Sequence, residues 1–166
     1  VGVLRMDVDN LGLIFSQGLQ GKGIAHLMAL SRNLTCFFKL YLNWICQADE
    51  SRINPSGMNL PLNLCGKNFS QEDGMNGRRV SIVYAGGDDL FIVGSWDDVA
   101  ELSFDIYRSF RAYTGWNPDF SLSGGMVVQH SNFPLYQLAE AAKVAEGKAK
   151  GNLEPCTEER RKEHEC

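Results

Sequence analysis

The feature that most constrains the fold is a pair of short apolar runs joined by glycines and acids. Residues 80–84 and 90–93 each have the composition of a strand, and Ala-Gly-Gly-Asp-Asp separates them. A connection of this length predicts a β-hairpin with a tight tip. Gly86 and Gly87 have no Cβ atoms, so they would allow a tight turn and a close approach by a ligand. Glycine and aspartate are also common in ordinary hairpin turns, so the motif alone does not establish a site.

The rest of the chain supplies the other elements of an α+β fold. Residues 1–8 form an apolar run typical of a central strand covered on both faces. Apolar periodicity and end signals predict helices at 23–48, 97–113 and 135–150, and a further strand at 120–129. This order predicts a ferredoxin-like domain, with a central, mainly antiparallel sheet and helices on one face. We expect one domain over 1–152, with a flexible insertion at about 49–78 and a charged tail or linker at 153–166.

Composition limits the classes of function. The chain has 166 residues, of which 44% are hydrophobic, and no run approaches the roughly 20 apolar residues that a membrane helix needs. Its five cysteines are scattered without a Cys-x-x-Cys pair, which favours a reducing cytoplasm. A formal charge of -4 argues against broad electrostatic binding of duplex nucleic acid. The sequence begins on an apolar strand without a methionine, as expected for a piece of a longer protein.

Asp7 is the second acidic feature. A carboxylate within an apolar strand is costly unless a cation or a hydrogen-bond donor satisfies it. A central sheet could bring Asp7 together with Asp88 and Asp89. Carboxylates suit hard cations, and two Mg²⁺ or Mn²⁺ ions are the usual means of activating a hydroxyl and neutralising a phosphate in nucleotidyl transfer. We therefore predict a two-metal site formed by these three aspartates and the carbonyl oxygen of Val8.

Two further parts of the chain are candidates for nucleotide contacts. The backbone amides of Asn10, Leu11 and Gly12 could hold a triphosphate at a helix N-terminus. Asp9, just before them, is either an N-cap or a direct ligand. The other part consists of two lysines on the last predicted helix, Lys143 and Lys148. They could contact phosphates or could be ordinary solvated charges.

Paired glycines interrupt the strand predicted at 120–129. The sequence there is Ser123-Gly124-Gly125. Glycines weaken a strand interior, so the pair indicates close approach by a ligand or by another backbone, or else a bulge.

The combined motifs resemble a known family. The sequences R-M-D-V-D-N-L-G, Y-A-G-G-D-D-L-F-I-V-G and L-S-G-G, followed by a helix rich in lysine and alanine, are similar to the polymerase-like palm of the large signature subunit of type III CRISPR effector complexes. The resemblance covers most of residues 1–152. It implies a palm fold that converts ATP into cyclic oligoadenylates within a complex containing other subunits, guide RNA and target RNA.

The resemblance also assigns residues. It implies metal binding by Asp7, Asp88 and Asp89, and nucleotide contacts by Gly86, Gly87, Ser123 and Gly124, with a looser match at Lys143 and Lys148. Members of the family pair two palms around ATP, which implies a second palm or a homodimer as a partner. No His-Asp dipeptide occurs in the sequence, so the nuclease domain of such subunits is expected outside this chain.

Two alternatives remain at this point. A diguanylate cyclase has a similar loop, but that family has Glu-Phe where this chain has Asp89-Leu90. A palm that binds nucleotide or protein partners without turnover is the other alternative. Three uncompensated carboxylates kept together argue against it, since their mutual repulsion is costly without a cation.

Overall fold

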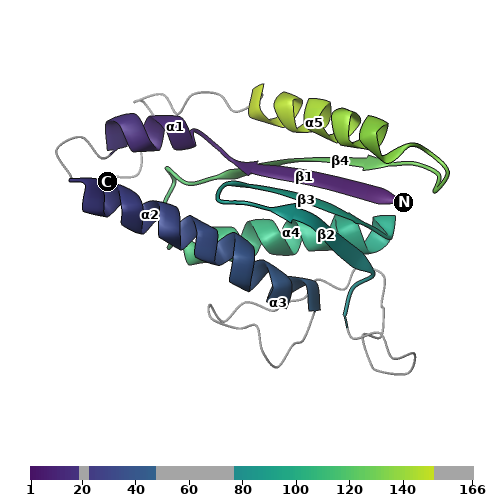
Figure 1. Ribbon diagram of the computed structural model, residues 1–166, viewed down its shortest axis with the longest axis horizontal. Coiled ribbons are helices and arrows are strands. Elements are labelled where there is room, and N and C mark those ends of the chain that lie inside the picture. The colour runs from purple at the N-terminus through teal and green to yellow at the C-terminus, as the bar shows by residue number, and fades with distance from the viewer. Residues whose placement is uncertain (19–22, 48–76, 152–166) are drawn as a thin grey trace, which may run out of the picture.

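The computed structural model describes residues 1–18, 23–47 and 77–151 (Figure 1). Nearly all of the predicted insertion at 49–78, and the whole predicted tail at 153–166, lie outside the described residues. The described elements are β1 (Gly2–Val8), α1 (Leu11–Leu13), η1 (Ile14–Gly18), α2 (Ile24–Cys36), η2 (Phe37–Tyr41), α3 (Leu42–Gln47), β2 (Val80–Ala85), β3 (Asp89–Gly94), α4 (Trp96–Tyr113), β4 (Leu122–Val128) and α5 (Leu135–Gly151).

The four strands form one antiparallel sheet in the order β2-β3-β1-β4. Strand β1 therefore lies between β3 and β4, and β2 is an edge strand. This is the strand order of two interleaved βαβ units, the plan predicted from the sequence. A β-bulge interrupts the pairing of β2 with β3 between Ile82 and Tyr84.

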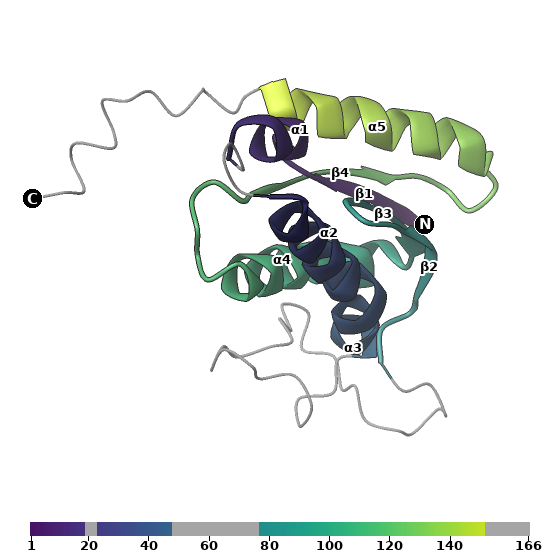
Figure 2. The same cartoon turned by 60° about the vertical axis from the view of Figure 1, so that its left-hand side comes forward.

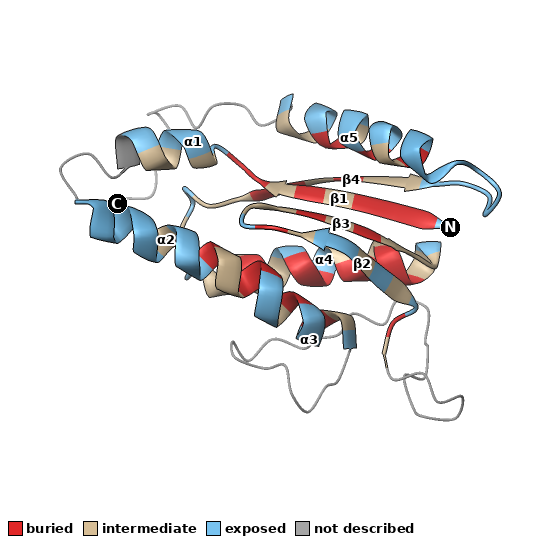
Figure 3. Ribbon diagram, viewed as in Figure 1, coloured by how far each residue is buried: buried red, intermediate tan, exposed pale blue. Residues whose placement is uncertain are grey.

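Helices α2, α3 and α4 cover one face of the sheet and enclose the larger core (Figure 3). The segment from Ile24 to Gln47 is helical throughout, as predicted, and includes the π-helical turn η2. Phe37 and Phe38 in this turn are buried and pack edge-to-face at 5.3 Å, and Phe110 of α4 lies 5.2 Å from Phe37. None of the described helices is long and apolar enough to cross a membrane.

Helix α5 covers the opposite face of the sheet, as Figure 2 shows. The α+β palm fold is confirmed, but the expectation that all helices lie on one face was wrong. Leu138 and Ala142 of α5 pack on Val3 in a second, smaller core. The helices that connect parallel strands share one face because such crossovers are right-handed. Helix α5 follows the last strand, so no crossover restricts it to that face, and β1 is covered on both sides.

Gly125 allows α5 to approach the sheet. A Cβ atom at this position would overlap the backbone of Glu146 and Ala142, and would lie 2.8 Å from the carbonyl carbon of Ala145. Of the interpretations offered for the paired glycines, close approach by another backbone is therefore correct for Gly125. We expect Gly125→Ala to lower the free energy of unfolding by about 1–3 kcal/mol, because the packing has no room for the methyl group. Urea unfolding followed by circular dichroism measures this change.

Gly147 on α5 provides the matched control for that prediction. A Cβ atom there would meet nothing within 4 Å. Gly147→Ala should leave stability unchanged or raise it by up to about 1 kcal/mol, because alanine favours the helix. Equal effects of the two substitutions would show that α5 does not pack tightly on β4.

Candidate active site at one end of the sheet

The three predicted acids meet where β1 ends. Asp7 and Asp89 are cross-strand partners in the pairing of β1 with β3. Directly opposed residues of an antiparallel pair project from the same face, so both side chains lie on the face covered by α5. Asp88 is held beside them, because the backbone amide of Val8 donates a 3.0 Å hydrogen bond to its carbonyl oxygen. The structure thus brings together the acids of two segments about 80 residues apart.

The close approach of the three acids makes the ionised form of Asp88 less favourable. Burial raises the pKa of its carboxyl group, and repulsion from Asp7 and Asp89 raises the pKa further. A backbone hydrogen bond and the charge of Lys150 act in the opposite direction. The net shift is upward, so the negative charge of Asp88 is unfavourable in this fold without an added cation.

The glycines of the turn have ordinary backbone conformations but differ in the space around them. Neither Gly86 nor Gly87 has a positive φ, so the turn does not depend on glycine's wider backbone freedom. The amide of Gly86 donates a 2.8 Å hydrogen bond to the carbonyl oxygen of Asp89. The Tyr84 hydroxyl occupies the space of a Cβ atom at Gly86, and Thr35 Oγ1 would lie 3.7 Å from a Cβ atom at Gly87. Contact of these glycines with a nucleotide stays a prediction.

Tyr84 is a neighbour of the acids that sequence reasoning missed. The negative charge of Asp89 raises the pKa of the Tyr84 hydroxyl, with smaller contributions from desolvation, a hydrogen bond to Asp89 and the charge of Asp88. The side chain is exposed at the rim of the site. Its position two residues before the Gly-Gly-Asp-Asp turn was the available signal.

Two cationic side chains also reach the acids. Lys150, in the last turn of α5, forms an ion pair with Asp7. Arg5, two residues before Asp7 on β1, lies 3.7 Å from Asp89. Glu146 connects them, at 2.9 Å from Arg5 Nε and 3.1 Å from Lys150 Nζ. Figure 1 shows the C-terminal end of α5 beside α1, at the end of the sheet where β1 finishes.

These contacts bear on whether the site fits a metal. Within the described ranges, no three His, Cys, Asp or Glu side chains are already arranged to hold a metal ion. Asp7 is instead turned to Lys150, and Asp89 to Arg5 and Tyr84. The donor set nevertheless suits a hard cation, because it consists of carboxylates that already attract positive charge. Rotation of short side chains about fixed backbone positions would free them for a metal.

The other predicted contact residues differ in their position relative to the acids. Ser123 is the cross-strand partner of Asp7 and is buried on the same face. Gly124 pairs with Met6 on the opposite face, where a Cβ atom would lie 2.9 Å from Met6 Cγ. Lys143 and Lys148 are exposed on α5. Phosphate binding by these lysines stays a prediction, whereas Lys150 is the α5 lysine in contact with the acids.

The segment after β1 begins with the short helix α1 and continues directly into the π-helical η1. Helix α1 spans three residues, and its N-cap is Asn10 in the left-handed conformation without a side-chain cap. Asp9 is not the N-cap; it is buried and accepts a 2.6 Å hydrogen bond from the Ser121 hydroxyl. Leu11 and Gly12 open the helix next to the acids. Their binding of a triphosphate stays a prediction.

Comparison with known proteins assigns this arrangement to a family. Residues 1–155 match the family described as Cas10/Cmr2, second palm domain. The Cas10/Csm1 single-strand-specific deoxyribonuclease (subtype III-A) of Methanocaldococcus jannaschii is 36% identical over 147 residues, which is 88% of this chain and 16% of that protein. The protein of the same description from Mycobacterium tuberculosis is 32% identical over 156 residues, covering 90% and 17%. The chain thus spans about a sixth of these relatives.

Solved structures give the same result. Csm1 from T. onnurineus superposes with a TM-score of 0.71 at 34% identity, covering 90% of this chain and 19% of that one. Two Csm1-Csm4 cassettes, one in complex with cA4 and one with a single ATP, give TM-scores of 0.72 at 33% and 34% identity with the same coverage. Part of Csm1 therefore shares the fold described above.

Proposed function

The chain belongs to the Cas10/Cmr2 second palm domain family, and we propose that it is a nucleotidyl transferase domain that converts ATP into cyclic oligoadenylates. We further propose that the chain acts within a type III CRISPR effector complex, together with partner subunits, guide RNA, target RNA and a second palm. The observation that carries it is the cross-strand pairing of Asp7 with Asp89, with Asp88 at the adjoining turn. Nucleotide complexes of structural neighbours support ATP as the substrate.

The reaction joins nucleotides one bond at a time. A ribose hydroxyl oxygen of one ATP loses its proton to solvent and bonds to the α-phosphorus of another, the bond from that phosphorus to the bridging α–β oxygen breaks, and pyrophosphate leaves. In the final step the terminal ribose hydroxyl of the oligomer attacks the α-phosphorus of its own triphosphate in the same way, which closes the ring and releases the last pyrophosphate. Two divalent cations, when bound, would lower the pKa of the attacking hydroxyl and neutralise the phosphate oxygens.

The residues of the chain would hold and orient these groups. We assign the cations to the carboxylates of Asp7, Asp88 and Asp89, with the Val8 carbonyl as a further oxygen ligand. Their backbone positions are fixed by the β1–β3 ladder and by the hydrogen bond from Val8 to Asp88. This rigidity favours reaction, because positions set before substrate binds need no reorganisation during it.

Product identification tests the proposal. The subunit containing this chain, assembled with its partner subunits, guide RNA and target RNA, is incubated with labelled ATP or GTP and with Mg²⁺ or Mn²⁺. Cyclic oligoadenylate, identified by mass spectrometry, is expected from ATP and only when metal is present. Cyclic di-GMP as the sole product would instead assign a diguanylate cyclase. Absence of any nucleotide product from the active complex would assign a non-catalytic palm.

A further inference from the structure

The acidic centre contains its own cation. The ammonium of Lys150 contacts Asp7 Oδ2, one of the oxygens that a metal would need. The lysine is about one-third exposed and Asp7 is about one-quarter exposed, so the pair lies at the rim of the sheet rather than in the core. At this partly exposed position, the ammonium can contact a carboxylate oxygen that would otherwise bind a metal ion.

Glu146 gives Lys150 a second partner. It lies one helical turn before Lys150 on α5, and its Oε1 is 3.1 Å from the ammonium. Its other oxygen is 2.9 Å from Arg5, which reaches Asp89. Glu146 thus links two cations, each of which contacts one of the three acids. If Lys150 left Asp7, it would still have a carboxylate partner on its own helix.

A divalent ion and this ammonium cannot share the same carboxylate oxygen at full strength. A metal bound between Asp7 and the Asp88–Asp89 turn would repel Lys150 and would compete for the lone pairs of Asp7. The flexible lysine stem allows the ammonium to move while the backbone of α5 stays in place. The metal-free and metal-bound states would therefore differ in whether Lys150 is paired with both Asp7 and Glu146 or with Glu146 alone.

We propose that Lys150 is an internal counterion that pairs with both Asp7 and Glu146 in the metal-free state, and that divalent metal displaces it from Asp7 and leaves it paired with Glu146 alone. This inference rests on the metal site proposed above. It assigns Lys150 and Glu146 opposite roles. The lysine competes with the metal, and the glutamate helps metal binding by holding the displaced ammonium. Neither role requires contact with the nucleotide.

Metal affinity without nucleotide is the test. The chain is titrated with Mn²⁺ by isothermal calorimetry, so that any contact of Lys150 with phosphates plays no part. Lys150→Met should bind Mn²⁺ about three- to fivefold more tightly, since a partly exposed ion pair contributes up to about that factor. Glu146→Gln should bind it several-fold more weakly, because Lys150 and Arg5 lose their alternative partner. Lys150→Arg retains the charge and should remain near the parent.

Lys39→Met on η2 controls for the loss of one positive charge, since that lysine is exposed on another element. Circular dichroism of each variant establishes that it is folded before titration. Unchanged or weaker binding by Lys150→Met would overturn the inference while leaving the metal site intact. Failure of the parent chain to bind millimolar Mn²⁺ would overturn the metal site and this inference together.

Discussion

Asp88→Asn is expected to reduce cyclic oligoadenylate synthesis by at least about 1000-fold in the assembled complex. The substitution removes one of three carboxylates that would hold the cations, and the loss corresponds to about 4 kcal/mol of transition-state stabilisation. Rates of product formation from labelled ATP, at saturating target RNA and metal, measure the effect. Glu140→Gln, on the exposed side of α5, is the charge-matched control and should retain the parent rate.

The same substitution should not weaken the fold. Burial and repulsion from Asp7 and Asp89 raise the pKa of Asp88 in the folded chain. A raised carboxyl pKa gives stability that is present below the unfolded value and is lost as pH rises through the folded value. At neutral pH the charge therefore opposes folding. In metal-free buffer, the parent should lose stability relative to Asp88→Asn as the pH is raised from about 4 to 7 in thermal unfolding.

Asp7→Asn and Asp89→Asn should also abolish synthesis, and combining substitutions should add little. Groups that act as one unit are not additive, since the first loss removes most of what the unit contributes. Retention of the parent rate by Asp88→Asn and by Asp89→Asn would leave a non-catalytic palm as the function. A complex that makes product with all three acids replaced would exclude this site altogether.

The sequence predicted the secondary structure closely, because each element has a strong local pattern. The apolar run at 1–8 became β1, and the periodicity at 97–113 became α4 (Trp96–Tyr113). The placement of α5 was wrong because nothing in its own sequence specifies a face of the sheet. Gly125 indicated a close approach to the sheet, but the sequence did not distinguish among approach by a ligand, approach by another backbone and a bulge.

The meeting of the three acids could be predicted because a charge interrupts an apolar pattern, whereas their function stays a prediction. Asp7 was recognisable because a lone acid in an apolar strand needs a partner. Arg5 and Lys150 were missed because their significance depends on which residues meet across the sheet. The α5 signal was nonetheless present, since the buried positions Leu138, Ala142 and Glu146 recur every four residues and the next is Lys150.

Arg78→Met is expected to lower the free energy of unfolding by about 3–5 kcal/mol, because the buried Asp105 carboxylate loses its cation. The two side chains are almost fully buried and form an ion pair. Arg78 also donates a 3.1 Å hydrogen bond from Nη1 to the carbonyl oxygen of Ile45, and another of that length from its backbone amide to Cys46. For a chain of this size the melting temperature should fall by about 6–20 °C.

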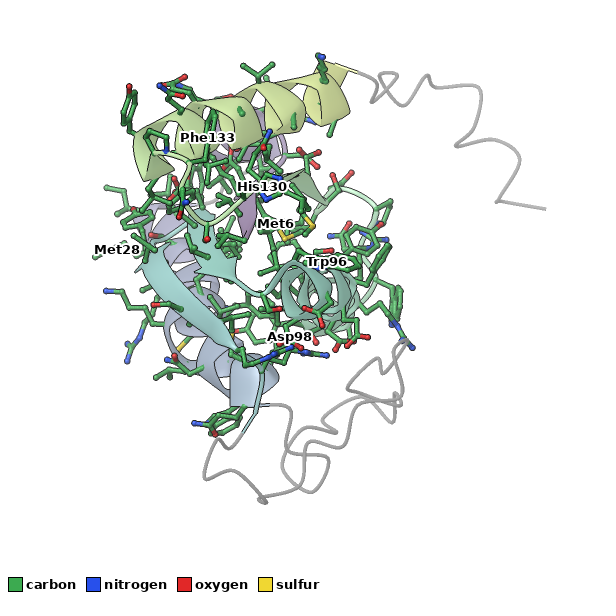
Figure 4. All side chains as sticks on the ribbon, turned by 90° about the vertical axis from the view of Figure 1, so that its right-hand side faces the viewer. Met6, Met28, Trp96, Asp98, His130 and Phe133 are labelled. Carbon is green, nitrogen blue, oxygen red and sulfur yellow. The ribbon has the colours of Figure 1, made fainter. Side chains whose placement is uncertain are left out.

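Figure 4 shows Asp98 on the side of the sheet opposite α5. Arg79, the neighbour of Arg78 in the sequence, pairs with Asp98 at 3.1 Å. Chemical unfolding of Arg78→Met and of the double variant Arg78→Met/Asp105→Leu measures the contribution of the buried charge. The double variant should recover more than half of the loss, since two apolar side chains avoid an uncompensated carboxylate. A loss below about 1 kcal/mol in the single variant would show that the pair is dispensable.

Arg78 lies two residues before the start of β2, at the opposite end of that strand from the turn that contains Asp88. Loss of the ion pair should therefore affect synthesis only through folding. Well below its melting temperature, Arg78→Met should therefore retain far more activity than Asp88→Asn.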